Sequence, residues 1–188
     1  MLNHCVHLSE RDIALIAEAG SPVIHDPTSN MLLASGIAPL PELRDAGVLL
    51  GLGCDGPACN NGQDMIENMK YAALLQKAVT RQADVVVAAE VFRMATAGGA
   101  AAIGLGDRLG RLAPGMLADV VLIDMRRPHL TPMHDPLAAL VYGARSSDVD
   151  TVLVGGRVVV RHGVVQTLDE QRVVRAVAQR ARVARARS

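Results

Sequence analysis

Short, continuous apolar runs alternate with amphipathic helices along about the first hundred residues, and this rhythm restricts the folds open to the chain. Residues 22–25 and 48–52 are such runs, and residues 1–6 resemble the end of another. Runs of this length without polar alternation are typical of strands buried on both faces. Because helices are predicted between them, the pattern favours a parallel α/β sheet or barrel.

The helix signals are local and specific. Ser9 is a predicted N-cap, with acidic residues in the turn that follows, and Gly20 is a predicted left-handed stop. Further helices are expected over about residues 41–46, 63–79 and 88–103. Four or five strand–helix units cannot close an eight-stranded barrel. If the fold is a barrel, its first half therefore lies elsewhere.

The alternation of apolar runs and amphipathic helices ends at about residue 105. A strand is predicted over 118–124, a hairpin turns at Gly155-Gly156 between 151–154 and 157–160, and a last short strand covers 164–167. A helix over 168–188 carries many arginines on one side. That face could bind an acidic partner, although a solvated face is the better interpretation. We expect the chain to divide into three segments, which are residues 1–105, residues 106–167 and residues 168–188.

Composition excludes several classes of protein. Lys plus Arg and Asp plus Glu number 19 each, and only 2% of the residues are aromatic, which argues against nucleic-acid binding. No apolar run approaches the roughly 18 residues of a membrane span. Three cysteines without a secretory framework indicate reduced thiols. We expect a cytoplasmic protein with no nucleic-acid or membrane partner.

Candidate chemical groups stand where the predicted strands end. Asp55 follows the run 48–52, His4 ends the first strand, and His25 ends the second. In α/β barrels, the carboxyl ends of the strands carry the catalytic groups. Taken alone, Asp55 is more simply a turn-capping residue, and His25 is more simply structural. Cys54 and Cys59 are a poor zinc pair and are interpreted as packing or loop-lining residues.

The combination of motifs is far more specific than its parts. In order, the chain contains His4-Cys-Val-His-Leu8, His25-Asp-Pro-Thr-Ser-Asn30, Gly51-Leu-Gly-Cys-Asp55-Gly56 with Asn60-Asn61, and Gly110-Arg-Leu-Ala-Pro-Gly115 leading into Ala118-Asp119. This series resembles the amidohydrolase superfamily, in its branch of methylthioadenosine/S-adenosylhomocysteine deaminases, guanine deaminases and triazine hydrolases. The resemblance implies the C-terminal half of a TIM-type (β/α)8 barrel, part of a small β-sandwich and a C-terminal helix.

The resemblance also implies residue roles. Asp55 matches the aspartate that ends the eighth barrel strand, a metal ligand that also takes a proton from the attacking water. His4 matches a histidine from the fifth-to-sixth strand region that helps to polarise the reacting centre. His25, Asn30 and Asn60 match positions near the substrate mouth. The implied reaction is hydrolytic deamination of a small amino-substituted heterocycle, with one divalent metal ion, zinc or alternatively iron.

The family pattern further requires a His-x-His pair and a third metal-binding His, and this chain contains none of them. We therefore expect a chain that is inactive alone and that needs the upstream half of the barrel as a partner, or a homo-oligomer that covers its exposed surfaces. Two alternatives stay open, a triazine chlorohydrolase and a non-catalytic oligomerisation module or remnant.

Overall fold

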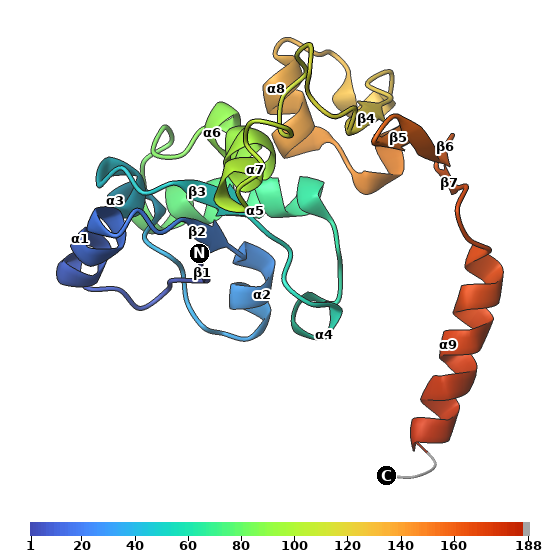
Figure 1. The fold of residues 1–188 in the computed structure, drawn as a ribbon, viewed down its shortest axis with the longest axis horizontal. Coiled ribbons are helices and arrows are strands. Elements are labelled where there is room, and N and C mark those ends of the chain that lie inside the picture. The colour runs from blue at the N-terminus through green and yellow to red at the C-terminus, as the bar shows by residue number, and fades with distance from the viewer. Residues whose placement is uncertain (186–188) are drawn as a thin grey trace. The chain divides into compact units, whose positions relative to one another are not determined.

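The computed structural model describes residues 1–185, which form two compact units (Figure 1). The first unit comprises Met1–Leu117 and Met125–Ser146, and the second comprises Ala118–Asp124 and the chain from Ser147 onward. Met125–Ser146 belongs to the first unit because it packs on α5 and α6, with Val141 fully buried. These units do not coincide with the segments 1–105, 106–167 and 168–188, whose standing as domains stays a prediction.

A three-stranded parallel sheet with the order β1-β2-β3 lies at the centre of the first unit. Its strands are β1 (Leu2–Asn3), β2 (Val23–His25) and β3 (Leu50–Leu52). Leu2 pairs with Val23, which in turn pairs with Leu50, so the carboxyl ends of the three strands lie side by side at the same end of the sheet. The parallel sheet predicted from the apolar runs is confirmed.

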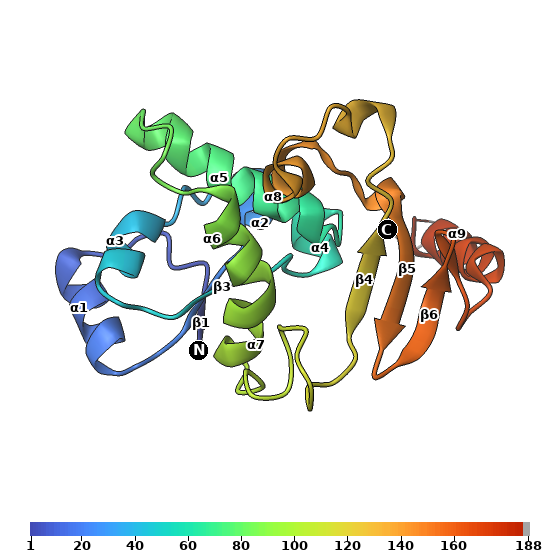
Figure 2. The ribbon, with the colours of Figure 1, turned by 90° about the horizontal axis from the view of Figure 1, so that it is seen from above.

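The helices of this unit follow the predicted signals closely. α1 (Glu10–Glu18) begins at Ser9, whose side chain forms a reciprocal capping box with Asp12, and Gly20 lies in the left-handed region with φ +59°. The other predicted helices are α3 (Leu40–Asp45), α5 (Met65–Thr80) and a continuous rod made of α6 (Ala88–Arg93), the π-helical turn η1 (Met94–Gly98) and α7 (Gly99–Ala102) (Figure 2).

Several short helices were not predicted. α2 (Pro27–Leu32) and α4 (Pro57–Asn60) each begin with proline, whose fixed φ and missing N–H suit the first helical position. α2 begins two residues after β2 ends, and α4 begins in the loop that follows β3. The segment Met125–Ser146 contributes the short helices η2 (Pro128–Leu130), α8 (Pro136–Ala138) and η3 (Ala139–Gly143).

The rod packs directly on the backbone of β3, where only glycine fits. A Cβ atom on Gly98 would overlap the carbonyl oxygen of Leu50, and one on Gly51 would approach the Cα atom of Gly99 to 3.2 Å. The glycine pairs therefore set the separation between the rod and the strand that leads to Asp55.

Gly98→Ala is expected to lower the free energy of unfolding by about 1–3 kcal/mol, because the new methyl group forces β3 and η1 apart. Helix propensity alone would give the opposite sign, a gain of about 1 kcal/mol. Chemical denaturation of the chain measures the difference. Gly62→Ala, which meets nothing within 4 Å, is the matched control and should change stability by less than about 0.5 kcal/mol.

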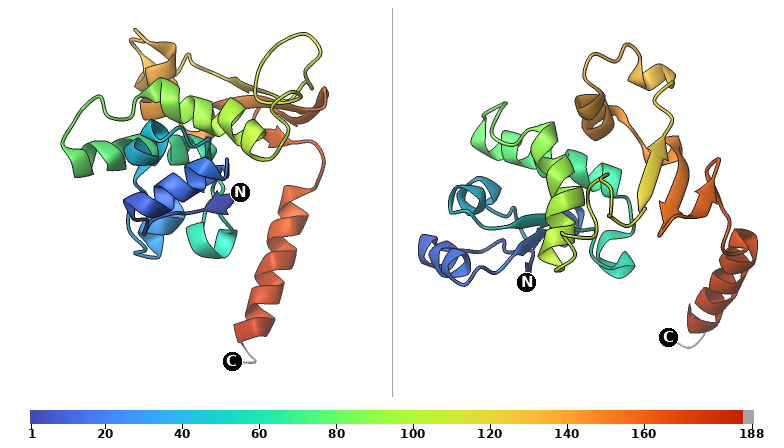
Figure 3. Two further views of the ribbon diagram at one scale, coloured as in Figure 1. Left: turned by 60° about the vertical axis from the view of Figure 1, so that its left-hand side comes forward. Right: turned by 45° about the horizontal axis from the view of Figure 1, so that its top comes forward.

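The second unit contains an antiparallel sheet with the order β4-β5-β6-β7. Its strands are β4 (Val120–Ile123), β5 (Val149–Val154), β6 (Arg157–Arg161) and β7 (Val164–Val165). The predicted hairpin at Gly155-Gly156 is confirmed, with both glycines at positive φ. The helix α9 (Glu170–Arg185) follows as a straight rod, exposed along its whole length (Figure 3). The rest of the predicted segment, residues 186–188, lies outside the described residues.

Within residues 1–185, no helix combines the length and the apolar character needed to cross a membrane.

Candidate active site

Three polar side chains follow the carboxyl ends of the three parallel strands. His4 comes directly after β1, Asp26 directly after β2, and Asp55 three residues after β3. His4 and Asp55 both have positive φ, +65° and +59° respectively. Non-glycine residues in this region are uncommon and cluster at functional sites. The sheet register thus brings together two of the residues that the sequence singled out, although 51 positions separate them.

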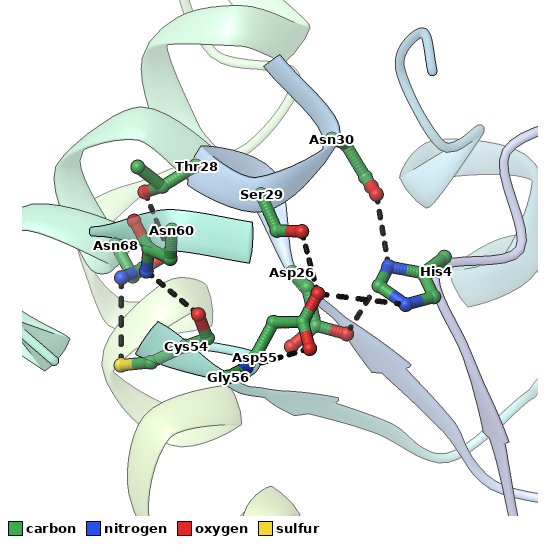
Figure 4. Close-up of polar contacts among 10 residues, drawn as sticks. All are labelled: His4, Asp26, Thr28, Ser29, Asn30, Cys54, Asp55, Gly56, Asn60 and Asn68. Atoms are coloured by element: carbon green, nitrogen blue, oxygen red, sulfur yellow. Dashed lines mark hydrogen bonds and ion pairs between the residues drawn. The ribbon is translucent and has the colours of Figure 1, made fainter. Parts of the chain in front are cut away.

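The side chains of His4 and Asp55 face each other (Figure 4). His4 Nε2 lies 3.9 Å from Asp55 Oδ2, and His4 Nδ1 lies 3.6 Å from Asp26 Oδ2. The His4 side chain is 42% exposed and that of Asp55 is 25% exposed, whereas Asp26 is buried. An imidazole and a carboxylate that converge at an open surface can exchange and hold protons.

The short helix α2 supplies partners to both groups. Ser29 Oγ donates a hydrogen bond to Asp55 Oδ2 at 2.5 Å, and Asn30 Oδ1 lies 2.9 Å from His4 Nδ1. The backbone N–H of Gly56 donates to Asp55 Oδ1 at 2.6 Å. These donors, Ser29 first, hold the pKa of Asp55 below its usual range, so its carboxyl group is ionised at neutral pH.

The pKa of Asp26 is shifted in the opposite direction from that of Asp55. Its burial raises the pKa of its carboxyl group above the usual range, and the nearby Asp55 carboxylate adds to that rise. Sequence reasoning missed Asp26 and Ser29, although both stand in the string His25-Asp-Pro-Thr-Ser-Asn30. The available signal for Asp26 was its position directly after the predicted strand 22–25, and Ser29 follows three residues later.

His25 and Asn60 form none of the hydrogen bonds or ion pairs described above with His4 or Asp55. The His25 side chain is fully buried, and neither ring nitrogen has a hydrogen-bond partner within residues 1–185. Asn60 is buried in the loop after β3, where its Nδ2 donates to the carbonyl oxygen of Cys54 at 2.6 Å. Their expected contacts with substrate stay predictions. Cys54 lines this loop, and burial raises the pKa of its thiol.

The buried His25 should make stability depend on pH. Burial, followed by the nearby His4, lowers the pKa of His25 to about 4 in the folded chain. The unfolded chain, with a His pKa of about 6.5, then binds the proton better, so stability is complete above about pH 6.5 and is lost as the pH falls towards 4. Between pH 7 and 5, the free energy of unfolding should fall by about 2 kcal/mol more than in His25→Leu. Equal pH dependence in denaturation of the two proteins would contradict this.

The fit of this site to a metal ion is partial. Asp55 still has unused acceptor positions, because a carboxylate offers about four lone-pair sites and the hydrogen bonds above use two. Catalytic zinc usually takes three protein ligands. In the described part of the chain, however, no group of three or more His, Cys, Asp and Glu side chains could hold a metal ion. The chain therefore offers part of a donor set, with Asp55 as its best candidate.

The fold and the site together define an α/β protein with ionisable groups gathered at the carboxyl ends of parallel strands, the arrangement of barrel enzymes. The chain belongs to the amidohydrolase family, whose model matches residues 1–159.

Curated relatives narrow the resemblance to one branch. The chain is 51% identical over 178 residues to a 5-methylthioadenosine/S-adenosylhomocysteine deaminase of Pelotomaculum thermopropionicum, covering 95% of this chain and 41% of the relative. It is 52% identical over 179 residues to the protein of the same name from Desulforudis audaxviator, covering 95% and 42%. The chain thus spans about two fifths of the length of these relatives.

Solved structures support the same family assignment. A zinc-bound adenosine deaminase from Xanthomonas campestris matches with a TM-score of 0.93 at 38% identity, covering 97% of this chain and 42% of that one. A zinc-bound atrazine chlorohydrolase from Arthrobacter aurescens matches with a TM-score of 0.88 at 29% identity, covering 94% and 39%. Guanine deaminase from E. coli matches with a TM-score of 0.76 at 26% identity, covering 86% and 39%. The fold is therefore that of part of an amidohydrolase.

Proposed function

We propose that this chain is the C-terminal portion of a metal-dependent hydrolytic deaminase that acts on an amino-substituted nitrogen heterocycle, such as a purine nucleoside or base. The convergence of His4 Nε2 and Asp55 Oδ2 at 3.9 Å is the observation that carries the proposal. The names of the relatives, with 51% identity to a methylthioadenosine/S-adenosylhomocysteine deaminase, support the substrate class.

In this proposal, Asp55 is a metal ligand and the proton carrier. Asp55 would hold a zinc or iron ion together with ligands from the rest of the barrel, and the ion would lower the pKa of water towards about 7. The ionised carboxylate of Asp55 accepts the proton from the attacking water and returns it to the departing ammonia. Nδ1–H of His4 is already donated to Asn30 Oδ1, so His4 acts as an imidazolium, whose Nε2–H donates a hydrogen bond to the negatively charged atom that develops beside the reacting carbon.

The remaining barrel strands are the proposed partner of this chain. Within residues 1–185, β1 and β3 each pair with one strand only, so both edges of the parallel sheet carry unpaired backbone groups. Leu2 and Leu49, on or beside these strands, are 41% and 42% exposed. A barrel half that pairs with these edges would cover them and supply the missing metal ligands. The chain alone is then inactive, and a homo-oligomer is a second way to cover the same surfaces.

A chimera tests the proposal. This chain replaces the matched 178-residue segment of the Pelotomaculum thermopropionicum relative, and ammonia release is measured with methylthioadenosine, S-adenosylhomocysteine, adenosine and guanine. The relative itself is the positive control, and the relative without its matched segment is the negative control. Zinc-dependent ammonia release by the chimera is expected. A folded chimera that binds no zinc and releases no ammonia would favour a non-catalytic oligomerisation module.

The structural match to atrazine chlorohydrolase favours one other enzyme, a triazine chlorohydrolase. The two reactions share an attacking water and differ in the leaving group. Incubating the chimera with atrazine and measuring chloride separates them. Chloride release without ammonia release from any purine would replace the deaminase proposal.

A further inference from the structure

We propose that Ser29 and Asn30, adjacent residues of α2, are the positioning residues of this site: Ser29 orients the carboxylate of Asp55, and Asn30 orients the imidazole of His4. This inference rests on the proposed function and deepens it. It assigns to one short helix the task of fixing two reactive groups that come from two different strands.

The topology makes α2 suitable for this task. β2 is the middle strand of the sheet, and α2 begins two residues after it, so the helix lies beside the ends of both β1 and β3. The Ser29 side chain points toward Asp55 and the Asn30 side chain points toward His4 (Figure 4).

The two positioning residues are far more buried than the reactive groups that they orient. Ser29 is 0% exposed and Asn30 is 2% exposed, whereas the side chains of His4 and Asp55 are 42% and 25% exposed. Buried side chains therefore hydrogen-bond to the partly exposed reactive groups. Outer partners of this kind fix the orientation of a ligand or base and limit the positions it can sample.

The hydrogen bonds also determine which atoms stay free to react. Ser29 binds Oδ2 of Asp55 and the Gly56 N–H binds Oδ1, so the plane of the carboxylate is fixed by one donor on each oxygen. Asn30 Oδ1 accepts a hydrogen bond from Nδ1–H of His4, which leaves Nε2 directed at Asp55. Without these partners, both side chains would sample other rotamers.

Paired substitutions in the chimera test the inference. Ser29→Ala removes the hydroxyl donor, and Ser29→Thr restores it. We expect Ser29→Ala to lower zinc affinity, measured by competition with a chelator, and kcat by about 10–100-fold each, with KM changed less than about threefold. Asn30→Leu should lower kcat by a similar factor while zinc content is retained, and Asn30→Asp, which keeps the accepting oxygen, should recover most of it.

Thr28→Val is the matched control for loosening of α2. Thr28 Oγ1 donates at 2.8 Å to Asn68 Oδ1 of α5, so this variant removes a side-chain hydrogen bond from the same helix without touching Asp55 or His4. We expect zinc affinity and kcat within about threefold of the parent.

The outcomes separate the inference from the proposed function. An active parent in which Ser29→Ala behaves like Thr28→Val, or in which Ser29→Thr restores nothing although it is folded, overturns the inference alone. A parent chimera that neither binds zinc nor releases ammonia overturns the proposed function, and the inference with it.

Discussion

Replacing Asp55 by Asn in the chimera is expected to reduce the rate of ammonia release by at least about 10²–10⁴-fold and to lower zinc content together with it. Asn keeps the size of the side chain and its backbone tolerance for positive φ, which Asp55 has at +59°. It removes the negative charge that the hydrogen bonds from Ser29 and Gly56 stabilise. The loss therefore reports on proton transfer and metal binding, and not on a change of fold.

The control for this variant is Asp45→Asn. Asp45 lies on α3, with a side chain that is 68% exposed, and pairs only locally with Arg44 in the contacts described here. Its replacement should leave both ammonia release and zinc content unchanged. Unaltered zinc content and activity in Asp55→Asn would show that Asp55 is the turn-capping residue that its loop also allows.

His4→Asn is expected to reduce kcat by about 10²–10³-fold while zinc content is retained. Asn tolerates the positive φ of His4, +65°, but its shorter side chain no longer carries a donor to the position of Nε2. The measured quantities are kcat and zinc content in parallel. Loss of zinc together with activity would make His4 a metal ligand, contrary to the role proposed here.

His7→Asn is the matched control, because His7 is an exposed histidine three residues further along the same segment. It should leave kcat within about threefold of the parent. The contrast between His4 and His7 separates the residue at the end of β1 from its neighbour in the same motif.

The strands and most long helices could be predicted because their signals are local. The apolar runs gave β2 and β3, and Ser9 and Gly20 gave the limits of α1 to within a residue or two. α2 could not be predicted in this way, because six residues are too few to show helical periodicity. Pro27 follows the predicted strand 22–25, and in the structure it is the first residue of α2.

Side-chain contacts within the site were harder to predict from the sequence than the positions of its residues. His4 and Asp55 could be placed near each other because the carboxyl ends of parallel strands share one edge. The contact of Ser29 with Asp55 depends on the register of β2 against β3 and on the unpredicted helix, so no local pattern contained it. The burial of His25 likewise follows from packing around β2, which spacing along the chain does not reveal.

Anomalous diffraction at the zinc edge, from crystals of the chimera, determines whether Asp55 is a metal ligand. We expect one zinc peak at about 2.0–2.2 Å from a carboxylate oxygen of Asp55, the bonding distance for zinc and oxygen, with Nε2 of His4 facing the site and not bonded to the ion. A zinc peak away from Asp55, or none in a crystal soaked with zinc, would contradict it.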